Sequence, residues 1–235
     1  MGWINKLSIA LLVGCMGITF SNEVLSQSSR EEKADLSRIM QQQEEALGIL
    51  YPGKPKIEWS FDKLDRDFSI KLWAMFHAAA LYDKRTDTIL IDQEKCNFSI
   101  RHKIIKKVYG FDPCLDPKHN LAHELGHYYV DQLHEAITKK DYVPEDKAKR
   151  MVGEGIAVYF ETIIIPRKIE CGNLPYLTQR GNIYTAGYCL VHPIIEKYRS
   201  RGIEALVLNP MTKKELDFPE EYQRRIKEWI EKRSD

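Results

Sequence analysis

The chain has 235 residues, enough for one hydrophobic core of ordinary size, because domains cluster near roughly 100 to 150 residues. Its 35 basic and 34 acidic residues nearly balance, and the basic residues are spread along the sequence. A nucleic-acid partner is therefore not expected, since that function needs a concentrated basic surface. We expect a single domain over residues 27–235.

The first residues have the layout of an export signal. A short segment with one lysine precedes an apolar run from Leu7 to Phe20, which is shorter than the roughly 20 residues that span a bilayer. Two processing sites stay open: a signal peptide of residues 1–26, or a lipoprotein signal of residues 1–14 that leaves Cys15 lipidated. An uncleaved N-terminal anchor is a third alternative. All three predict an extracytoplasmic protein that is secreted, periplasmic or held at a membrane by its N-terminus.

Four cysteines follow the signal, and an even number in an exported chain predicts two disulfides. Three pairings are possible. Pairing neighbours, Cys96 with Cys114 and Cys171 with Cys189, closes two short loops, each contributing about 3 kcal/mol in the chain-entropy model. A four-cysteine zinc site is disfavoured because the sequence has no C-x-x-C pair.

The front half of the mature chain is predicted to mix helices and strands. An amphipathic helix is expected from Ser29 to Leu50, ended by Tyr51-Pro52-Gly53. Strands are expected at Lys56 to Phe61 and, after a polar turn, at Thr88 to Asp92, while Phe68 to Leu81 fits either a helix or a strand. The apolar residues at helical spacing in the first helix are Leu36, Ile39, Met40, Leu47 and Leu50.

Two long helices are predicted next. Asp116-Pro117 supplies an N-cap and a first-turn proline for a helix that runs to about Ile137. After a polar connector, a second helix is expected from about Glu145 to Ile165, closed by Pro166. The C-terminal part should be helical from Ala186, with an amphipathic last helix and with breaks at Gly202, Pro210 and Pro219.

The sequence His123-Glu124-Leu125-Gly126-His127 is an H-E-x-x-H motif inside the first of these long helices. Residues four apart lie on one helix face, about 6 Å apart along the axis, so both imidazoles can reach one tetrahedral ion. Glu124 lies one step around the helix, where its carboxylate can accept a proton from water activated by the metal. The motif predicts a zinc site with Glu124 as general base.

A catalytic zinc site needs a third protein ligand. The metzincin pattern is excluded, because Val130 and Leu133 occupy the positions of its glycine and third histidine. His134 lies too far along the helix and is expected to be a solvated helix residue. The preferred candidate is Glu154 on the second helix, whose flanking glycines would let two helices approach closely around a metal.

The pair of motifs resembles the gluzincins, the superfamily of thermolysin-like metallopeptidases that includes zinc aminopeptidases. The resemblance rests on H-E-x-x-H followed by E-G-x-x-x-Y-x-E, which begins at Glu154. It implies that Glu154 is the third zinc ligand, although the connection from His127 is longer than in those enzymes. Tyr184 resembles the tyrosine of their Y-x-x-G motif, which would stabilise an oxyanion, and Tyr188 competes for this role.

The resemblance covers about half of the chain. The segment from Ala80 to Asp92 resembles the strand beside the active cleft of such peptidases, whose edge could pair with an extended peptide. The G-A-M-E-N type motif of the aminopeptidases is absent from the sequence, so the kind of peptidase is left open. Metal-bound histidines usually donate their second nitrogen to an acceptor, and Asp131 and Glu161 are candidates for that contact.

These observations predict an α+β, zincin-like fold with a small mixed sheet, two helices that frame one zinc ion per chain, and a helical C-terminal part. His123, His127 and Glu154 would bind the zinc, and Glu124 and Tyr184 would act in hydrolysis of a peptide bond in a peptide or protein substrate. The alternatives are a non-catalytic binding module stabilised by zinc, and a zinc hydrolase that acts on a non-protein amide.

Overall fold

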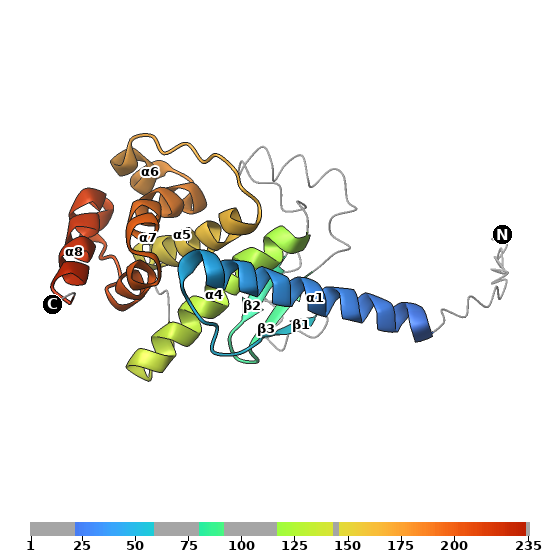
Figure 1. The fold of residues 1–235 in the computed structure, drawn as a ribbon. Coiled ribbons are helices and arrows are strands. Elements are labelled where there is room, and N and C mark those ends of the chain that lie inside the picture. The colour runs from blue at the N-terminus through green and yellow to red at the C-terminus, as the bar shows by residue number, and fades with distance from the viewer. Residues whose placement is uncertain (1–21, 59–79, 92–116, 143–145, 234–235) are drawn as a thin grey trace, which may run out of the picture. The chain divides into compact units, whose positions relative to one another are not determined.

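The computed structural model describes residues 22–58, 80–91, 117–142 and 146–233 (Figure 1). Residues 35–235 form one compact unit, and residues 1–34, which include the start of the first helix, form another. The described chain is mostly helical with one small mixed sheet, which confirms the expected mixture of helices and strands. None of the described helices combines the length and the apolar character needed to cross a membrane.

The sheet has three described strands: β1 (Lys56–Glu58), β2 (Ala80–Asp83) and β3 (Thr88–Ile91). Their spatial order is β1-β3-β2, with β1 parallel and β2 antiparallel to β3. Both expected strands are therefore confirmed in their described parts. The ambiguous run up to Leu81 is described only in its last two residues, which belong to β2. The predicted pair Cys96–Cys114 lies outside the described residues.

Helix α1 (Asn22–Leu47) begins and ends earlier than predicted. It ends at Gly48, whose φ of 64° is the left-handed conformation that favours glycine after a helix. The prediction that the helix extends to Leu50 is wrong: the chain has left the helix there, and Leu50 is 82% exposed. Leu47 is the last residue of the apolar face and is fully buried.

The two long helices are α4 (Pro117–Thr138) and α5 (Lys147–Ile164), close to the predicted bounds. Asp146 caps α5, since its side chain accepts a hydrogen bond from the Lys149 N–H at 3.0 Å. The two helices pack closely at Gly126, where a Cβ would lie only 2.6 Å from the Cα of Ala157. The glycine that permits this approach lies within the H-E-x-x-H motif itself.

The C-terminal part contains α6 (Leu174–Arg180), α7 (Ile183–Leu208), a 3-10 turn (Lys214–Leu216) and α8 (Pro219–Glu231). The predicted break at Gly202 is wrong: α7 bends three residues earlier, at Arg199, which has a φ of 51°. Gly202 instead lets the last turns of α7 approach Ile194, because a Cβ there would lie 2.9 Å from the Ile194 oxygen. The predicted breaks at Pro210 and Pro219 are confirmed, because Pro210 follows the end of α7 and Pro219 is the first residue of α8.

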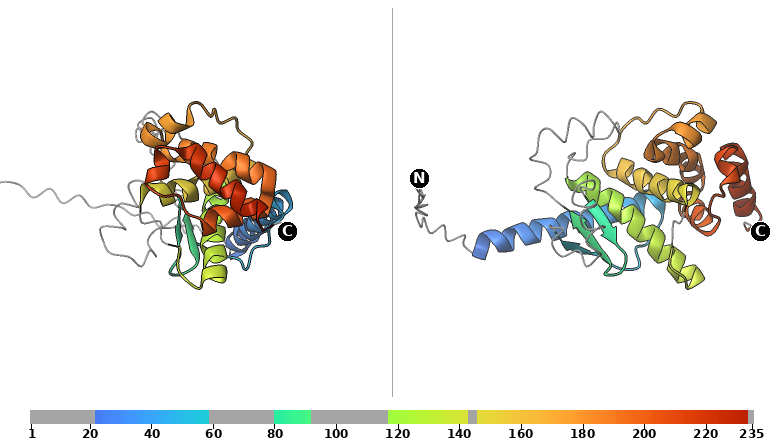
Figure 2. Two further views of the ribbon diagram at one scale, coloured as in Figure 1. Left: turned by 90° about the vertical axis from the view of Figure 1, so that its left-hand side faces the viewer. Right: turned by 180° about the vertical axis from the view of Figure 1, so that it is seen from behind.

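The buried apolar residues form two clusters, and α4 contributes to both. The ribbon views show α4 beside the sheet and beside α5 (Figures 1 and 2). We call the first the helical core; it lies mainly among α5, α7 and α8 and includes Met151, Phe160, Leu190, Ile194 and Tyr222. We call the second the sheet-side core; it joins α1, the sheet and one face of α4 and includes Ile39, Ile89, Ile91, Leu121 and Leu125. The H-E-x-x-H helix therefore packs against the sheet on one face and against α5 on another.

Candidate metal centre

Helix α4 presents His123 and His127 one turn apart. Their ring centroids are 4.9 Å apart and the ring planes are inclined by 78°. The two side chains are 14% and 26% exposed, so both rings are partly covered yet reachable from solvent. Because residues four apart lie on one face of a helix, the two predicted histidines lie side by side, as the motif requires.

Helix α5 brings Glu154 to these histidines. Its Oε2 atom lies 3.4 Å from the Nε2 atom of His123 and 3.4 Å from the Nε2 atom of His127. In a tetrahedral zinc site with bonds near 2.0 to 2.2 Å, two ligand atoms are about 3.3 to 3.6 Å apart. The three candidate ligand atoms all lie within 4.8 Å of one another. The donor set and both carboxylate separations therefore fit a small divalent cation such as zinc.

The second ring nitrogen of His123 faces Glu161, which follows Glu154 by two turns of α5. The Nδ1 atom of His123 lies 3.2 Å from Oε2 of Glu161. A hydrogen bond donated from Nδ1 leaves the lone pair of Nε2 free to bind a metal. Of the two carboxylates that the sequence offered for this contact, the structure places Glu161 on a ligand histidine.

The histidines and carboxylates of this cluster shift one another's pKa values. Burial disfavours the imidazolium of His123, but hydrogen bonds to Glu154 and Glu161 raise its pKa to about 10. Burial likewise opposes ionisation of Glu154, yet the charge of His127 and the bonds to both histidines hold its pKa well below the usual range. For Glu161 the contacts with His119 and His123 outweigh burial and lower its pKa to about 2. Both carboxylates are thus anionic at neutral pH, whereas His123 carries an extra proton, which a metal ion must displace from Nε2 on binding.

Glu124 is held by the sheet rather than by the cluster of candidate ligands. Its Oε2 atom accepts a hydrogen bond from the backbone N–H of Tyr82 on β2 at 2.8 Å, and only 8% of the residue is exposed. The converging ligand atoms in the described part of the chain belong to His123, His127 and Glu154. Glu124 therefore lies next to the candidate metal site with its carboxylate fixed in orientation.

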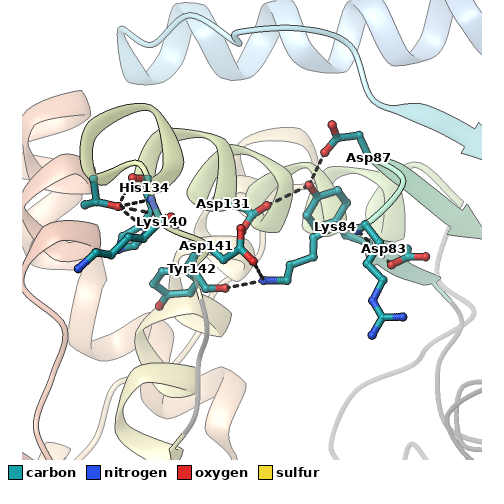
Figure 3. Close-up of polar contacts among 11 residues, drawn as sticks. Asp83, Lys84, Asp87, Asp131, His134, Lys140, Asp141 and Tyr142 are labelled. Carbon is teal, nitrogen blue, oxygen red and sulfur yellow. Dashed lines mark hydrogen bonds and ion pairs between the residues drawn. The ribbon is translucent and has the colours of Figure 1, made fainter. Parts of the chain in front are cut away.

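The strand that holds Glu124 is itself anchored by polar contacts (Figure 3). The hydroxyl of Tyr82 donates to Asp87 at 2.8 Å and also lies 3.3 Å from a carboxylate oxygen of Asp131. The neighbouring Lys84 lies 3.5 Å from Asp141, beyond the end of α4. Asp131 therefore fastens β2 to α4, and the alternative that it orients a ligand histidine is not what the structure shows.

Tyr184 and Tyr188 were the two candidates for the residue that donates a hydrogen bond to the oxyanion. Tyr184, in the first turn of α7, lies beside the candidate site, with its ring centroid 5.9 Å from that of His123 and 37% of the residue exposed. Tyr188 is buried and packs against Tyr159 and His192, with centroid separations of 6.2 and 5.0 Å. Only Tyr184 of the two is placed beside a candidate ligand.

The remaining histidines of α4 lie apart from the three candidate ligand atoms. His134 Nδ1 lies 2.9 Å from the carbonyl oxygen of Lys140, so the ring helps to cap the end of the helix. His119 is buried, with Nε2 2.5 Å from Oε1 of Glu161. Sequence reasoning missed this role of His119 and missed Arg167, whose Nη2 atom contacts the same oxygen. The spacing of four between His119 and His123 was an available signal, whereas nothing local pointed to Arg167.

Family models, curated proteins and solved structures yield no match to this chain.

Proposed function

We propose that the chain is an exported, gluzincin-like zinc metallopeptidase that hydrolyses peptide bonds in a peptide or protein substrate. The observation behind the proposal is the convergence of two histidine Nε2 atoms on one oxygen of Glu154, each at 3.4 Å. Two histidines and one carboxylate form the protein ligand set of many catalytic zinc sites. When bound, zinc supplies Lewis acidity, which polarises a carbonyl group and lowers the pKa of water to about 7.

Glu124 acts as the general base. Its carboxylate takes a proton from the attacking water as the new C–O bond forms at the scissile carbonyl, and passes that proton to the amine as the C–N bond breaks. The products are a carboxylate and an amine. The bond from the Tyr82 N–H supports this role, because it holds one carboxylate oxygen and so limits rotation of the side chain.

Tyr184 stabilises the negative charge that develops on the carbonyl oxygen. A phenol O–H placed at that oxygen offers a hydrogen bond that strengthens as charge accumulates. Its place beside His123 and its partial exposure support this role. Strand β2 lies at one end of the described sheet, next to Glu124, where an extended substrate could add its backbone.

An extracytoplasmic location is part of the proposal. The bond between Cys171 and Cys189, with Cα atoms 5.4 Å apart, confirms one of the two predicted disulfides. Disulfides persist in oxidising compartments, so this bond supports export, in keeping with the signal-like N-terminal sequence.

The test measures zinc content by elemental analysis and hydrolysis of denatured proteins and mixed peptides by mass spectrometry. The wild type is expected to hold one zinc per chain and to cleave peptides, and a zinc chelator should abolish cleavage until zinc is returned. His127→Ala should lose the metal, whereas His134→Ala, a histidine of the same helix outside the cluster, should keep metal and activity. A zinc protein that cleaves no peptide would favour the binding module or a non-protein amide as substrate; a wild type without affinity for zinc would end the proposal.

A further inference from the structure

A buried carboxylate near the candidate metal site is shared by three basic side chains. Glu161 is 1% exposed, and it contacts His123, His119 and Arg167. Removing an ionised carboxylate from water costs several kcal/mol unless it is paired. The contacts with two imidazoles and a guanidinium therefore allow Glu161 to be ionised at this position, two turns from Glu154 on the same helix.

The two oxygens of Glu161 have different partners. Oε2 faces Nδ1 of His123 at 3.2 Å, while Oε1 lies 2.5 Å from Nε2 of His119 and 2.5 Å from Nη2 of Arg167. Contacts at Oε1 stop the carboxylate from rotating about its terminal bond. The oxygen that faces His123 is thereby held in place by groups that do not touch the candidate metal site.

We infer that Arg167 and His119 are positioning residues, which act through Glu161 to orient His123 for metal binding. The inference rests on the proposed metal site and extends it beyond the candidate ligands. Neither residue is among the converging ligand atoms in the described part of the chain. Their effect on the metal is indirect: they fix Glu161, and Glu161 fixes the tautomer and the ring orientation of His123.

The chain holds Arg167 close to Glu161 by more than the ion pair. Arg167 lies in the segment between α5 and α6, and this segment starts with the Ile165 N–H bonded to the carbonyl oxygen of Glu161 at 3.0 Å. Four residues after Arg167, Cys171 is bonded to Cys189 on α7. The guanidinium is thus carried by a short segment that is fastened at both ends, which limits the entropy lost when it pairs.

The decisive experiment is a double-mutant cycle on zinc affinity, measured by competition with a chromophoric chelator in the full-length protein. Arg167→Met removes the charge and keeps much of the side-chain length, and Arg167→Lys restores a cation. Glu161→Gln keeps the shape of the carboxylate and removes its charge. Arg225→Met is the matched control. Arg225 lies on α8, which packs mainly against α7, and it forms an ion pair with Glu215 at 2.7 Å, away from the candidate metal site. The cobalt absorption spectrum of each variant reports the geometry of the bound ion.

We expect Glu161→Gln to weaken zinc binding about 10- to 100-fold, the range typical for groups that support a metal ligand. Arg167→Met should weaken it about tenfold, Arg167→Lys should restore part of the loss, and the cobalt spectrum of Arg167→Met should differ from that of the wild type. In the Glu161→Gln background, Arg167→Met should have little further effect, since Arg167 acts through Glu161.

Four results would overturn the inference, and each is separate from failure of the proposed function. They are an unchanged zinc affinity in Arg167→Met, an equal loss in Arg225→Met, an unchanged cobalt spectrum, and losses that simply add in the double variant. In all four cases the wild type still binds zinc, so the proposed metallopeptidase would stand. Absence of zinc binding by the wild type would instead remove the proposed function, and the inference with it. Urea unfolding of each metal-free variant separates loss of zinc affinity from loss of the fold.

Discussion

The helical core and the sheet-side core are built differently. The helical core relies on close backbone packing. A Cβ at Gly155 would overlap the backbone carbonyl of Gly187, so α5 and α7 can approach this closely only because these two residues are glycines. The sheet side uses buried polar groups that bond from one element to another. The Nε2 atom of Gln43, which is fully buried, donates to the carbonyl oxygens of Ala122 and Phe160 at 3.2 and 3.1 Å.

This difference suggests that the helical core mainly stabilises the fold, whereas the sheet side mainly orients residues of the candidate metal site. The two carbonyls that Gln43 binds belong to the residues before His123 and before Glu161, so the polar contacts lie next to the candidate site. Glu124 is likewise held by a backbone N–H of the sheet. Changes in the part of the helical core away from Glu154 and Glu161, around α8, should therefore lower stability with little specific effect on the metal, whereas changes on the sheet side should affect metal binding or catalysis more than stability.

The largest expected effect is on catalysis, in Glu124→Gln. The amide keeps the shape and can still accept the Tyr82 N–H bond, but it cannot accept a proton. Turnover should fall about 10²- to 10⁴-fold, while zinc content and the unfolding midpoint stay near the wild-type values. Steady-state hydrolysis, elemental analysis and urea unfolding measure the three quantities. Wild-type turnover in this variant would contradict the proposed mechanism.

Tyr184→Phe should have the next largest effect. Removal of the hydroxyl should cost about 2 to 4 kcal/mol of transition-state stabilisation, because one hydrogen bond to the oxyanion is lost. The loss should fall on kcat, with zinc affinity unchanged. Tyr176→Phe is the control, since Tyr176 is 61% exposed on α6 and lies outside the described ligand cluster. An equal loss in both variants would contradict the assignment.

Removal of the disulfide tests the helical core. The bond between Cys171 and Cys189 spans 18 residues, for which the chain-entropy model predicts about 3 kcal/mol of stabilisation. The variant with alanine at both positions should unfold at lower urea concentration by that amount. Reduction should lower the midpoint of the wild type more than that of the double variant, and this difference, which isolates the Cys171–Cys189 bond, provides the internal control.

Gly155→Ala tests backbone packing in the same core. The added methyl group would collide with the backbone of Gly187, so α5 and α7 must move apart, at a cost of about 1 to 3 kcal/mol. Gly172→Ala is the matched control, because a Cβ there meets no atom within 4 Å and should cost nothing. Equal stability of the two variants in urea would show that the helices do not pack as described.

On the sheet side, Gln43→Leu should lower both stability and zinc affinity. Loss of its two hydrogen bonds to backbone carbonyls should cost about 1 to 3 kcal/mol of stability, since each net hydrogen bond contributes about 0.5 to 1.5 kcal/mol. Zinc affinity should fall more in this variant than in Ile226→Ala, a helical-core variant on α8, relative to the loss of stability. A larger fall of zinc affinity in Ile226→Ala would contradict the different roles of the two cores.

Much of the framework follows from local patterns in the sequence. The start signal at Asp116-Pro117 and the stop signal at Pro166 predicted α4 and α5 almost to their ends. The spacing of four put His123 and His127 on one face, and neighbour pairing predicted the Cys171–Cys189 bond. These features depend on residues close together in the chain.

The tertiary structure alone decided which groups serve the candidate site. Asp131 and Glu161 were equal candidates by spacing, and only the way α5 and β2 pack against α4 directs Glu161 to His123 and Asp131 to Tyr82. Arg167 reaches Glu161 because the chain turns back after α5, and no local pattern encodes that turn. Helical period determines which residues share a face, but which partner meets that face depends on packing between segments distant in sequence.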